Sequence, residues 1–483
     1  MSHSSFQVAI IGGGAAGSIA ALRLAESGVS VHLFEQGPEL VNGPPFCHLH
    51  AGGCLYRELS DQQCLTLLEQ SIQTARSFPM AMRPRPTLIA VPKRDQGQVD
   101  EILPRLKLLR HRYQQLIEQD HANQVLGASE DYYRLFSREQ LEQIAQRAVP
   151  VTASSAEDWL VNAAQQLDLD QLKYPVLLVQ EYGMSLFRVA AMVTLAAERL
   201  PSLSVHLNSA VKRLRQQDDC WQITYQQQQQ AHALKVDYVI NAAGYRSGEI
   251  DDLVGASKQR LVEFKAAYLV HWPQAQGLWP EIVIHGQRGT KQGMAQLTPY
   301  GEGVFQLHGM APGITLFEQG IAQSSPNSAQ PRLPEQLAAL AEGRWPQALI
   351  EQRTRAAIEH IAAFIPSFEG AVLTARPLSG AQQIPGSDLQ QRVSGASFVG
   401  ERYARSEIVK FSSALTAADD ILRQLQQYTD VALPVAGSPL MYPAAVEMEH
   451  LNSTATDIVV HRHYPQALAA GYKNNQEGST VHQ

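Results

Sequence analysis

The chain has 483 residues, a length that predicts two or three domains at about 150 residues per domain. Hydrophobic residues make up 45% of it and charged residues 18%, which excludes disorder as the main state. Lys and Arg number 39 against 46 Asp and Glu, a net charge of −7 without a basic stripe, so we expect no nucleic-acid partner. The four cysteines are too few for a disulfide scaffold and form no CxxC pair, so we expect no metal site.

The first residues show no sign of a targeting segment. The chain begins Met-Ser-His-Ser-Ser and lacks the basic region and cleavage site of a signal peptide. It contains no stretch of about 20 unbroken apolar residues, the length that crosses a bilayer. We therefore expect a cytoplasmic protein without a transmembrane segment, and peripheral contact with a membrane stays open.

The predicted elements begin with a strand–helix–strand unit. Residues 6–11 predict a short buried strand, residues 15–27 a helix and residues 29–34 a second strand. Further helices are predicted at 98–118, after a capping box at 137–140 and at 185–199, and a strand is predicted at 204–207.

The second half of the chain predicts more strands than helices. A small meander is expected at 211–214, 221–225 and 236–240, and the glutamine run 226–230 within it is interpreted as a solvated turn rather than an aggregation-prone tract. Strands are also expected at 263–272, 282–285 and 303–308, and a last helix at 412–426. Three prolines and a polar end predict a loosely packed extension over 436–483.

The loop between the first strand and helix carries a dinucleotide-binding fingerprint. Residues 12–17, Gly-Gly-Gly-Ala-Ala-Gly, fit G-x-G-x-x-G. Gly12 would allow the tight turn, Gly14 the approach of a pyrophosphate and Gly17 the close packing of the helix on the strand. The free N–H groups and the dipole of the following helix would favour phosphates.

Two further signals narrow the choice of cofactor. Glu35 ends the second strand about 20 residues after the fingerprint, where a carboxylate can bind ribose hydroxyls and repel a 2′-phosphate. The apolar strand 236–240 runs into the small residues of Asn-Ala-Ala-Gly-Tyr-Arg-Ser, 241–247. Two contact segments about 200 residues apart suit a long cofactor in a discontinuous domain, which favours FAD over NAD.

With these two motifs the chain resembles the FAD-dependent D-amino-acid oxidase superfamily, which includes glycine and sarcosine oxidases, glycerol-3-phosphate dehydrogenase and 2-hydroxyglutarate dehydrogenase. The similarity runs, with gaps, from about residue 6 to residue 428. It implies an α/β fold: a discontinuous Rossmann-like FAD-binding domain and a second, substrate domain built on a mixed or antiparallel sheet. The expected domains are FAD-binding (1–80, 175–250 and 375–435), substrate or cap (81–174 and 251–374) and a C-terminal extension (436–483).

The resemblance also implies which residues contact the cofactor. The expected contacts are Gly12, Gly13, Gly14, Ala16, Gly17, Glu35, Gln36, Val211, Ala243 and Gly244. Among them, Val211 matches the position whose backbone meets the adenine, and Ala243 and Gly244 would line the cofactor.

Candidate catalytic residues fall in two segments. The sequence His50-Ala-Gly resembles the segment of hydroxy-acid and glycerophosphate dehydrogenases that runs beside the flavin. His50 could take the hydroxyl proton as hydride leaves; a covalent link to the flavin and a purely structural role stay open. Lys410 stands where relatives have a run of glycines and could supply the positive charge at the flavin's pyrimidine edge, with Ser412 or Ser413 capping the next helix.

Arginines could hold an anionic substrate. Arg57 is the first candidate for such a clamp, because a planar guanidinium binds a carboxylate through two hydrogen bonds. Arg246, His308 and Arg376 are further candidates, each weighed against a surface or structural role.

These residues predict a flavoenzyme that removes hydride from a CH–OH or CH–NH carbon of a small polar, carboxylate-bearing substrate. Electrons would pass to a quinone, another carrier or oxygen. Three alternatives stay open: the amine and N-methyl amino-acid branch, an enzyme that modifies tRNA, and a non-catalytic FAD-binding protein. The chain shows no Ser-His-Asp order, P-loop or HExxH motif, so hydrolase and kinase readings lack support.

Overall fold

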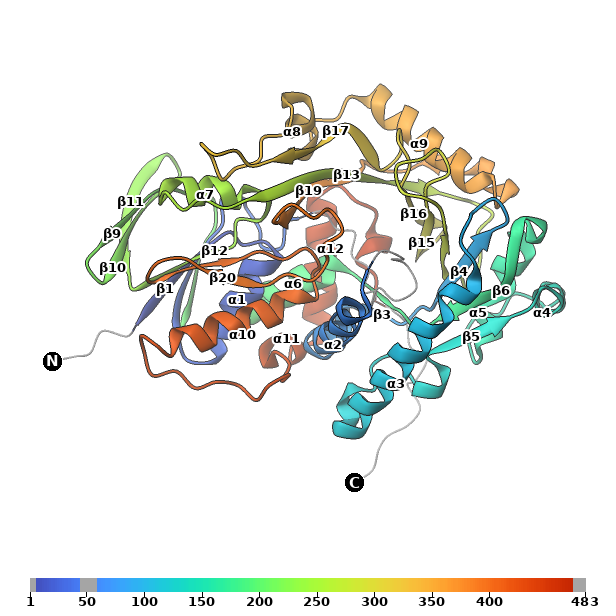
Figure 1. The fold of residues 1–483 in the computed structure, drawn as a ribbon, viewed down its shortest axis with the longest axis horizontal. Coiled ribbons are helices and arrows are strands. Elements are labelled where there is room, and N and C mark those ends of the chain that lie inside the picture. The colour runs from blue at the N-terminus through green and yellow to red at the C-terminus, as the bar shows by residue number, and fades with distance from the viewer. Residues whose placement is uncertain (1–5, 44–58, 472–483) are drawn as a thin grey trace.

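The computed structural model of the protein describes residues 6–43 and 59–471, and two sheets organise it (Figure 1). The first sheet has six strands, all parallel except the edge strand β20. In spatial order they are β20 (Ala396–Phe398), β21 (Tyr403–Ser406), β12 (Tyr238–Asn241), β1 (Gln7–Ile11), β2 (Ser30–Phe34) and β8 (Leu203–His206). The predicted strand–helix–strand unit is confirmed.

The six-stranded sheet is covered on both faces because successive side chains of a strand point to opposite sides. On β1, Val8 and Ile10 belong to a core formed with three helices, whereas Ala9 and Ile11 pack under a meander. The helices are α1 (Ala15–Glu26), α6 (Leu186–Ala197) and α10 (Ser413–Leu425). The meander is β9 (Ser209–Gln217), β10 (Cys220–Gln227) and β11 (Gln230–Val236).

The meander confirms one expectation and corrects another. Gln228 and Gln229 both have positive φ, at 48° and 67°, and form an exposed two-residue turn between β10 and β11. The single strand predicted over 236–240 is wrong, because β11 ends at Val236 and β12 begins at Tyr238. Between them, Asp237 accepts a hydrogen bond from the N–H of Gln7 (2.7 Å) and donates its own N–H to the Gln7 carbonyl (2.8 Å), which turns the chain into the parallel sheet.

The second sheet has ten strands and is mixed, as expected for the substrate half. Its longest member, β13 (Arg260–His271), runs along the top of Figure 1 and pairs with four other strands. The pairing of β14 with β4 is parallel and the others are antiparallel. The other strands are β17 (Leu316–Gln323), β16 (Val304–Gly309), β15 (Ala295–Gly301), β14 (Glu281–Ile284), β4 (Thr87–Pro92), β6 (Leu172–Val179), β5 (Tyr133–Phe136), β18 (Val372–Leu373) and β19 (Leu378–Pro385).

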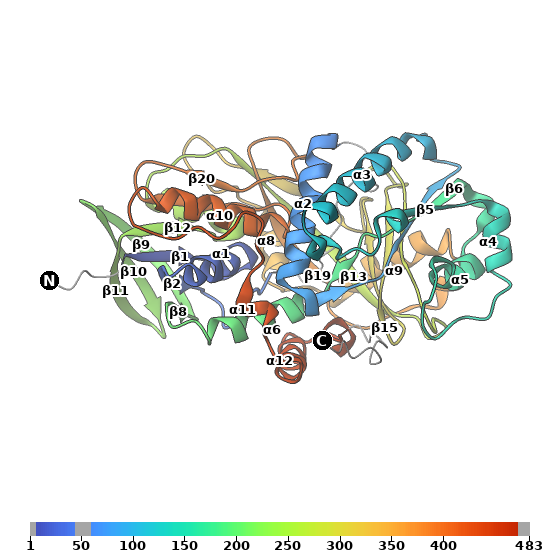
Figure 2. The ribbon, with the colours of Figure 1, turned by 90° about the horizontal axis from the view of Figure 1, so that it is seen from below.

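Helices pack on both sides of this large sheet. The pair α5 (Ala156–Gln166) and α9 (Gln347–Ala362) shares a core with β13 and β16, and α2 (Asp61–Ser77) and α3 (Leu103–Gln119) share another with β4 and β6. Seen from below, α2 lies between α10 and α3 (Figure 2), which links the helical layer of the first sheet to the second. The remaining elements are β3 (Met82–Arg83), α4 (Arg138–Ile144), β7 (Gly183–Met184), α7 (Ser247–Leu253) and α8 (Glu335–Ala341).

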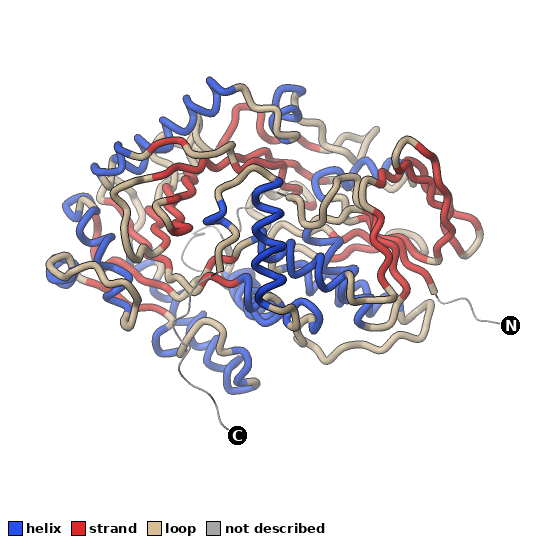
Figure 3. Tube along the Cα trace, turned by 180° about the vertical axis from the view of Figure 1, so that it is seen from behind, coloured by secondary structure: helices blue, strands red, loops and turns tan. Residues whose placement is uncertain are grey.

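The expectation of a loosely packed extension is wrong for the described residues after 436. They form α11 (Met441–Ala444) and α12 (Met448–His461), and Leu451, Ala455 and Val459 of α12 are completely buried in the core that α1 and α6 share. Figure 3 shows these helices among those that lie between the two groups of strands. Of the prolines that suggested loose packing, Pro434 and Pro439 precede α11 and Pro443 lies within it, so none of them prevents packing.

The division into domains stays a prediction. The predicted boundary at residue 175 falls inside β6, and β19, assigned to the cofactor segments, pairs with β13 of the large sheet. Among the described residues, no helix combines the length and the apolar character needed to cross a bilayer.

Candidate active site

The loop after β1 is packed so closely that two of its glycines have no room for a side chain. Gly12 has a φ of +105°, and a Cβ there would lie 2.5 Å from the carbonyl oxygen of Ala242. A Cβ at Gly17 would lie 1.8 Å from the Gly12 carbonyl oxygen. These contacts press the start of α1 against both β1 and the segment after β12, as the fingerprint predicted.

Gly14 has the opposite surroundings. A Cβ at this position would meet no atom within 4 Å, so the glycine faces open space. Gly14 is also the N-cap of α1, and no side chain caps the helix there. The first N–H groups of α1 and the positive end of its dipole are therefore directed to an open space suited to a phosphate.

Glu35 is buried at the end of β2 and is held by the neighbouring loops. Its Oε2 accepts a hydrogen bond from the N–H of Gly13 (2.7 Å), and its Oε1 accepts from the N–H of Gly37 (2.6 Å) and from Nδ2 of Asn42 (3.2 Å). A carboxylate has about four acceptor sites, so one remains for a ribose hydroxyl. Glu35 thus fits the role that its spacing predicted.

A cavity of about 810 Å³ adjoins this loop, and we call it the glycine-loop cavity. Eight of the predicted cofactor contacts line it: Gly12, Gly14, Ala16, Glu35, Gln36, Val211, Ala243 and Gly244. Gly13 and Gly17 lie behind this lining, where they hold Glu35 and pack the turn. The open space at Gly14, the uncapped helix and the buried carboxylate are the features that a dinucleotide with a pyrophosphate requires.

The C-terminal segment also lines the glycine-loop cavity, which the sequence analysis missed. Residues 461–464, at the end of α12 and just after it, face the loop that follows β2. The apolar spacing Leu451, Ala455, Ile458, Val459 is the signal that could have revealed α12 as a packed helix.

A second feature that sequence reasoning missed is a group of charged side chains on and beside β13, named here the β13 cluster: Glu263, Lys265, Arg288 and Arg392. Lys265 Nζ lies 2.7 Å from Oε2 of Glu263, and Arg288 contacts the other carboxylate oxygen. Arg392 lies close enough to affect the pKa of both Glu263 and Lys265. Two charged residues inside the apolar strand 261–270 are the signal that could have revealed it.

The β13 cluster connects directly to the lining of the glycine-loop cavity. Lys265 Nζ donates a hydrogen bond to Oε1 of Gln382 (3.0 Å). Gln382 lines the cavity and donates through Nε2 to the carbonyl of Val409 (2.7 Å), which directly precedes Lys410. A ligand in this part of the cavity therefore lies beside the cluster.

Burial and charge together set the ionisation of the cluster. Burial lowers the pKa of Lys265, and the nearby Arg288 and Arg392 add to this effect while Glu263 opposes it. Burial would raise the pKa of Glu263, but Lys265 and Arg288 outweigh that effect and hold it below its usual value. Two basic side chains, Lys265 and Arg288, therefore contact one carboxylate, Glu263, and Arg392 lies nearby.

Of the three predicted catalytic residues, the structure describes one, Lys410. His50 and Arg57 lie outside the described residues. Lys410 is half-buried just before α10, beside the Val409–Gln382 link, but is not among the residues that line the glycine-loop cavity. The expected serine cap is wrong: the Ser412 hydroxyl makes no capping bond, and the Ser413 hydroxyl instead donates to Oε1 of Gln70 (2.8 Å).

Of the further candidates, two reach the glycine-loop cavity. Arg246 lines it, stacked on Tyr245 and 3.3 Å from Glu342. Arg376 also lines it and donates to the hydroxyl of Tyr464 (3.1 Å). His308 lies on β16 and is not among the lining residues.

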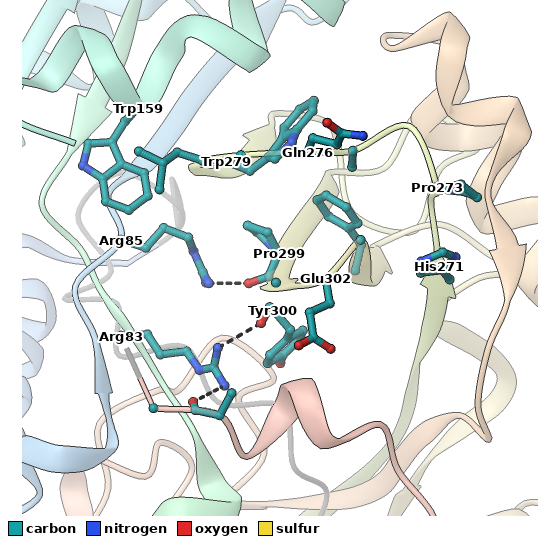
Figure 4. Close-up of a pocket in the computed structure, with 18 residues that line it drawn as sticks. Arg83, Arg85, Trp159, His271, Pro273, Gln276, Trp279, Pro299, Tyr300 and Glu302 are labelled. Carbon is teal, nitrogen blue, oxygen red and sulfur yellow. Dashed lines mark hydrogen bonds between the residues drawn. The ribbon is translucent and has the colours of Figure 1, made fainter. Parts of the chain in front are cut away.

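A separate cavity of about 510 Å³ lies at the far end of the large sheet, where residues 470 and 471 reach it (Figure 4). Arg83 and Arg85 point into this region and donate to the carbonyls of Tyr300 (3.4 Å) and Pro299 (2.5 Å). It shares no lining residue with the glycine-loop cavity.

Comparison with known proteins agrees with this geometry. The family model described as FAD dependent oxidoreductase (DAO) matches residues 7–382, so the chain belongs to this family. No curated protein matches the chain significantly. Because it belongs to this family, the protein is an FAD-dependent oxidoreductase, an enzyme whose cofactor is FAD.

Solved structures share the fold at low sequence identity. Glycine oxidase from Geobacillus kaustophilus is 13% identical, with 90% of this chain and 99% of that chain covered and a TM-score of 0.55. FAD-bound L-alpha-glycerophosphate oxidase from Mycoplasma pneumoniae is 14% identical (90% and 98% covered, TM-score 0.56). L-amino acid deaminase from Proteus vulgaris is 15% identical (90% and 96% covered, TM-score 0.56).

Proposed function

We propose that the enzyme oxidises a small carboxylate-bearing substrate at a CH–OH or CH–NH carbon, with FAD bound noncovalently in the glycine-loop cavity. The observation that carries this proposal is the β13 cluster beside the cavity, in which Lys265 and Arg288 share the single carboxylate of Glu263. Lys265 is buried and Arg288 is about one third exposed, and a bound anion would stabilise both charges. A substrate carboxylate provides that anion, and Lys265 and Arg288 would donate hydrogen bonds to it.

The chain's own residues have distinct parts in this proposal. FAD supplies the hydride acceptor. The β13 cluster would hold the carboxylate and so orient the carbon to be oxidised. His50 is the proposed acceptor of the substrate proton, Arg57 a second anion contact and Lys410 the positive charge near the flavin; these three roles rest on the sequence.

The two branches of the proposal share this carboxylate contact. Structures with the same fold include an oxidase of glycine and an L-amino acid deaminase, which suits the amine branch, and an oxidase of L-alpha-glycerophosphate, which suits CH–OH oxidation although its substrate has a phosphate in place of a carboxylate. The proposed electron acceptor is a quinone, another carrier or oxygen, and the cytoplasmic location stays a prediction.

The test is an anaerobic panel in which reduction of the bound flavin is followed by its visible absorption. The panel contains 2-hydroxy acids, glycine, sarcosine and D-amino acids, each paired with the primary amide that replaces its carboxylate. We expect at least one carboxylate to reduce the flavin and its amide to fail. Equal reduction by acid and amide, or reduction only by uncharged compounds, contradicts the carboxylate contact.

The variant Lys265→Met sharpens the test with the substrate that the panel identifies. We expect KM to rise by about tenfold or more with a smaller change in kcat, because one charged hydrogen bond to the substrate is lost. In the unmodified enzyme, KM should also rise with pH below the range where an ordinary lysine titrates, because the pKa of Lys265 is lowered. Lys173→Met is the control, since Lys173 lies on the same sheet but donates only to the carbonyls of Asp95 and Gly97.

A further inference from the structure

We propose that the end of α12 is a wall of the FAD site and that Arg462 is a positioning residue for the cofactor. The family match ends at residue 382, so the match does not cover this part of the chain. The proposal rests on the FAD site described above and is independent of the substrate. It assigns a cofactor-retaining role to the C-terminal segment, defined here as residues 438–471.

Arg462 binds three consecutive residues of the loop that follows β2. Its Nε donates to Oε2 of Glu39 (2.7 Å), and its two terminal nitrogens donate to the carbonyls of Leu40 and Val41 (3.0 Å each). Only 13% of the Arg462 side chain is exposed, so water competes weakly for these bonds. A planar guanidinium with three acceptors fixes the loop in one position, which a point charge would not do.

The same loop holds the glycine fingerprint in place. The N–H of Val41 donates to the carbonyl of Gly13 (2.8 Å), and the N–H of Gly13 donates to Glu35 (2.7 Å). The side chain of Leu40 fills the space where a Cβ on Gly13 would lie. Val41 has a φ of 49°, a conformation that a β-branched residue adopts only where its surroundings impose it. Arg462 bonds to the Val41 carbonyl and so helps to impose it.

Neighbours of Arg462 extend the contact along both sides of the glycine-loop cavity. His461 contacts the second oxygen of Glu39. Tyr464 accepts a hydrogen bond from Nε of Arg376 (3.1 Å) and donates to the carbonyl of Pro377 (3.2 Å), directly before β19. The segment thus connects the loop after β2 with β19, the strand that carries Gln382.

Two buried arginines anchor the C-terminal segment on either side of residues 461–464. Arg83 donates to the carbonyls of Ala467 (2.9 Å), Leu468 (3.0 Å) and Ala470 (3.0 Å), at the edge of the cavity in Figure 4. Arg188 donates to Oδ1 of Asn452 (2.8 Å) on α12. With both ends held, the wall formed by residues 461–464 is part of the folded body.

The test measures how fast the holoenzyme releases FAD after dilution, from the fluorescence of free flavin. We expect Arg462→Met to release FAD about tenfold faster or more, since it loses three bonds to the loop. Arg199→Met is the matched control: Arg199 also donates to the segment, at the Ala445 carbonyl (2.9 Å), but does not line the glycine-loop cavity. Its release rate should stay within about twofold of the unmodified protein's.

A second pair of variants guards against a simple loss of folding. His461→Gln should accelerate release, whereas His450→Gln should not, because His450 pairs with Glu447 on the surface of the same region and not with the loop after β2. Both variants should have the same unfolding temperature, measured by circular dichroism. Equal rates of FAD release for Arg462→Met and Arg199→Met would overturn the proposal. So would faster release that occurs only in variants with a lower unfolding temperature. A flavin that stays with acid-precipitated protein would overturn it as well, since a covalent bond would then retain the cofactor.

Discussion

Two glycines of the same loop have opposite structural needs. Gly12 adopts a φ of +105° against the backbone of Ala242, so its lack of a side chain serves the fold. Gly14 faces open space in an extended conformation that any residue adopts, so its lack of a side chain serves the ligand. A Gly→Ala substitution at position 12 therefore tests folding, and the same substitution at position 14 tests cofactor binding.

We expect Gly14→Ala to leave the unfolding temperature of the apoprotein nearly unchanged and to weaken FAD binding by about tenfold or more, because its methyl group occupies the space near the phosphates. Gly12→Ala should instead destabilise the fold by several kcal/mol, roughly the sum of a strained φ and a backbone clash. Circular dichroism and fluorescence titration with FAD measure the two effects. Normal FAD affinity in Gly14→Ala would show that the pyrophosphate lies elsewhere.

At the scale of elements, Asp251 on α7 joins strands of both sheets. Its carboxylate is completely buried and accepts from Arg260 on β13 (2.5 Å), from Arg405 on β21 (2.9 Å) and from the hydroxyl of Tyr403 (2.8 Å). Arg260 is also completely buried and pairs with Glu407 (2.8 Å). This network fixes the start of β13 to the edge of the six-stranded sheet.

We expect Asp251→Asn to lower the free energy of unfolding by about 3–5 kcal/mol, because the buried Arg405 loses its carboxylate contact and Arg260 keeps one carboxylate, Glu407, in place of two. The matched control is Asp252→Asn, the next residue of α7. Asp252 is exposed and accepts from Ser328 and from the N–H of Ala329, so its loss should cost about 1 kcal/mol or less. Urea denaturation measures both, and an equal cost would argue against the network's role.

The sequence predicted those elements whose signals are local. Residues 12–17 and Glu35 lie within one strand–helix–strand unit, so their spacing alone predicts that they meet. The β13 cluster needs the register of a ten-stranded sheet and two distant loops to bring Arg288 and Arg392 to Lys265, and no spacing in the chain encodes that. The Ser413 cap failed for a similar reason, because Gln70 of α2 takes its hydroxyl.

At the scale of the whole molecule, the C-terminal segment completes the core of the cofactor half. Leu440, Leu451, Ala455 and Val459 are completely buried. Pro439 and Pro443 lie within this segment and do not prevent its packing, which is why proline content alone misjudged it. Its apolar spacing at helical period was the better signal.

A chain that stops at Val435 should therefore fail to fold. The apolar side chains lost from the core would contribute about 1.5–3 kcal/mol each for the larger ones, and Arg83 and Arg188 would lose their carbonyl and amide acceptors. This exceeds what a domain stable by about 5–15 kcal/mol can lose. Soluble expression and a thermal melt measure the outcome; a soluble, flavin-containing truncated protein with a cooperative melt would contradict it.

The long strand β13 is held by neighbours along its whole length. From Arg260 to Ala267 its backbone is hydrogen-bonded to β19 on one side, and β17 and then β16 pair on the other. Its start is tied to the six-stranded sheet through Asp251, and its Ala267 and Leu269 lie in the core of the cofactor half. A hinge needs a few residues whose torsions are free to change, and this strand offers none. We therefore expect β13 to hold the two sheets in one arrangement while substrate enters and leaves.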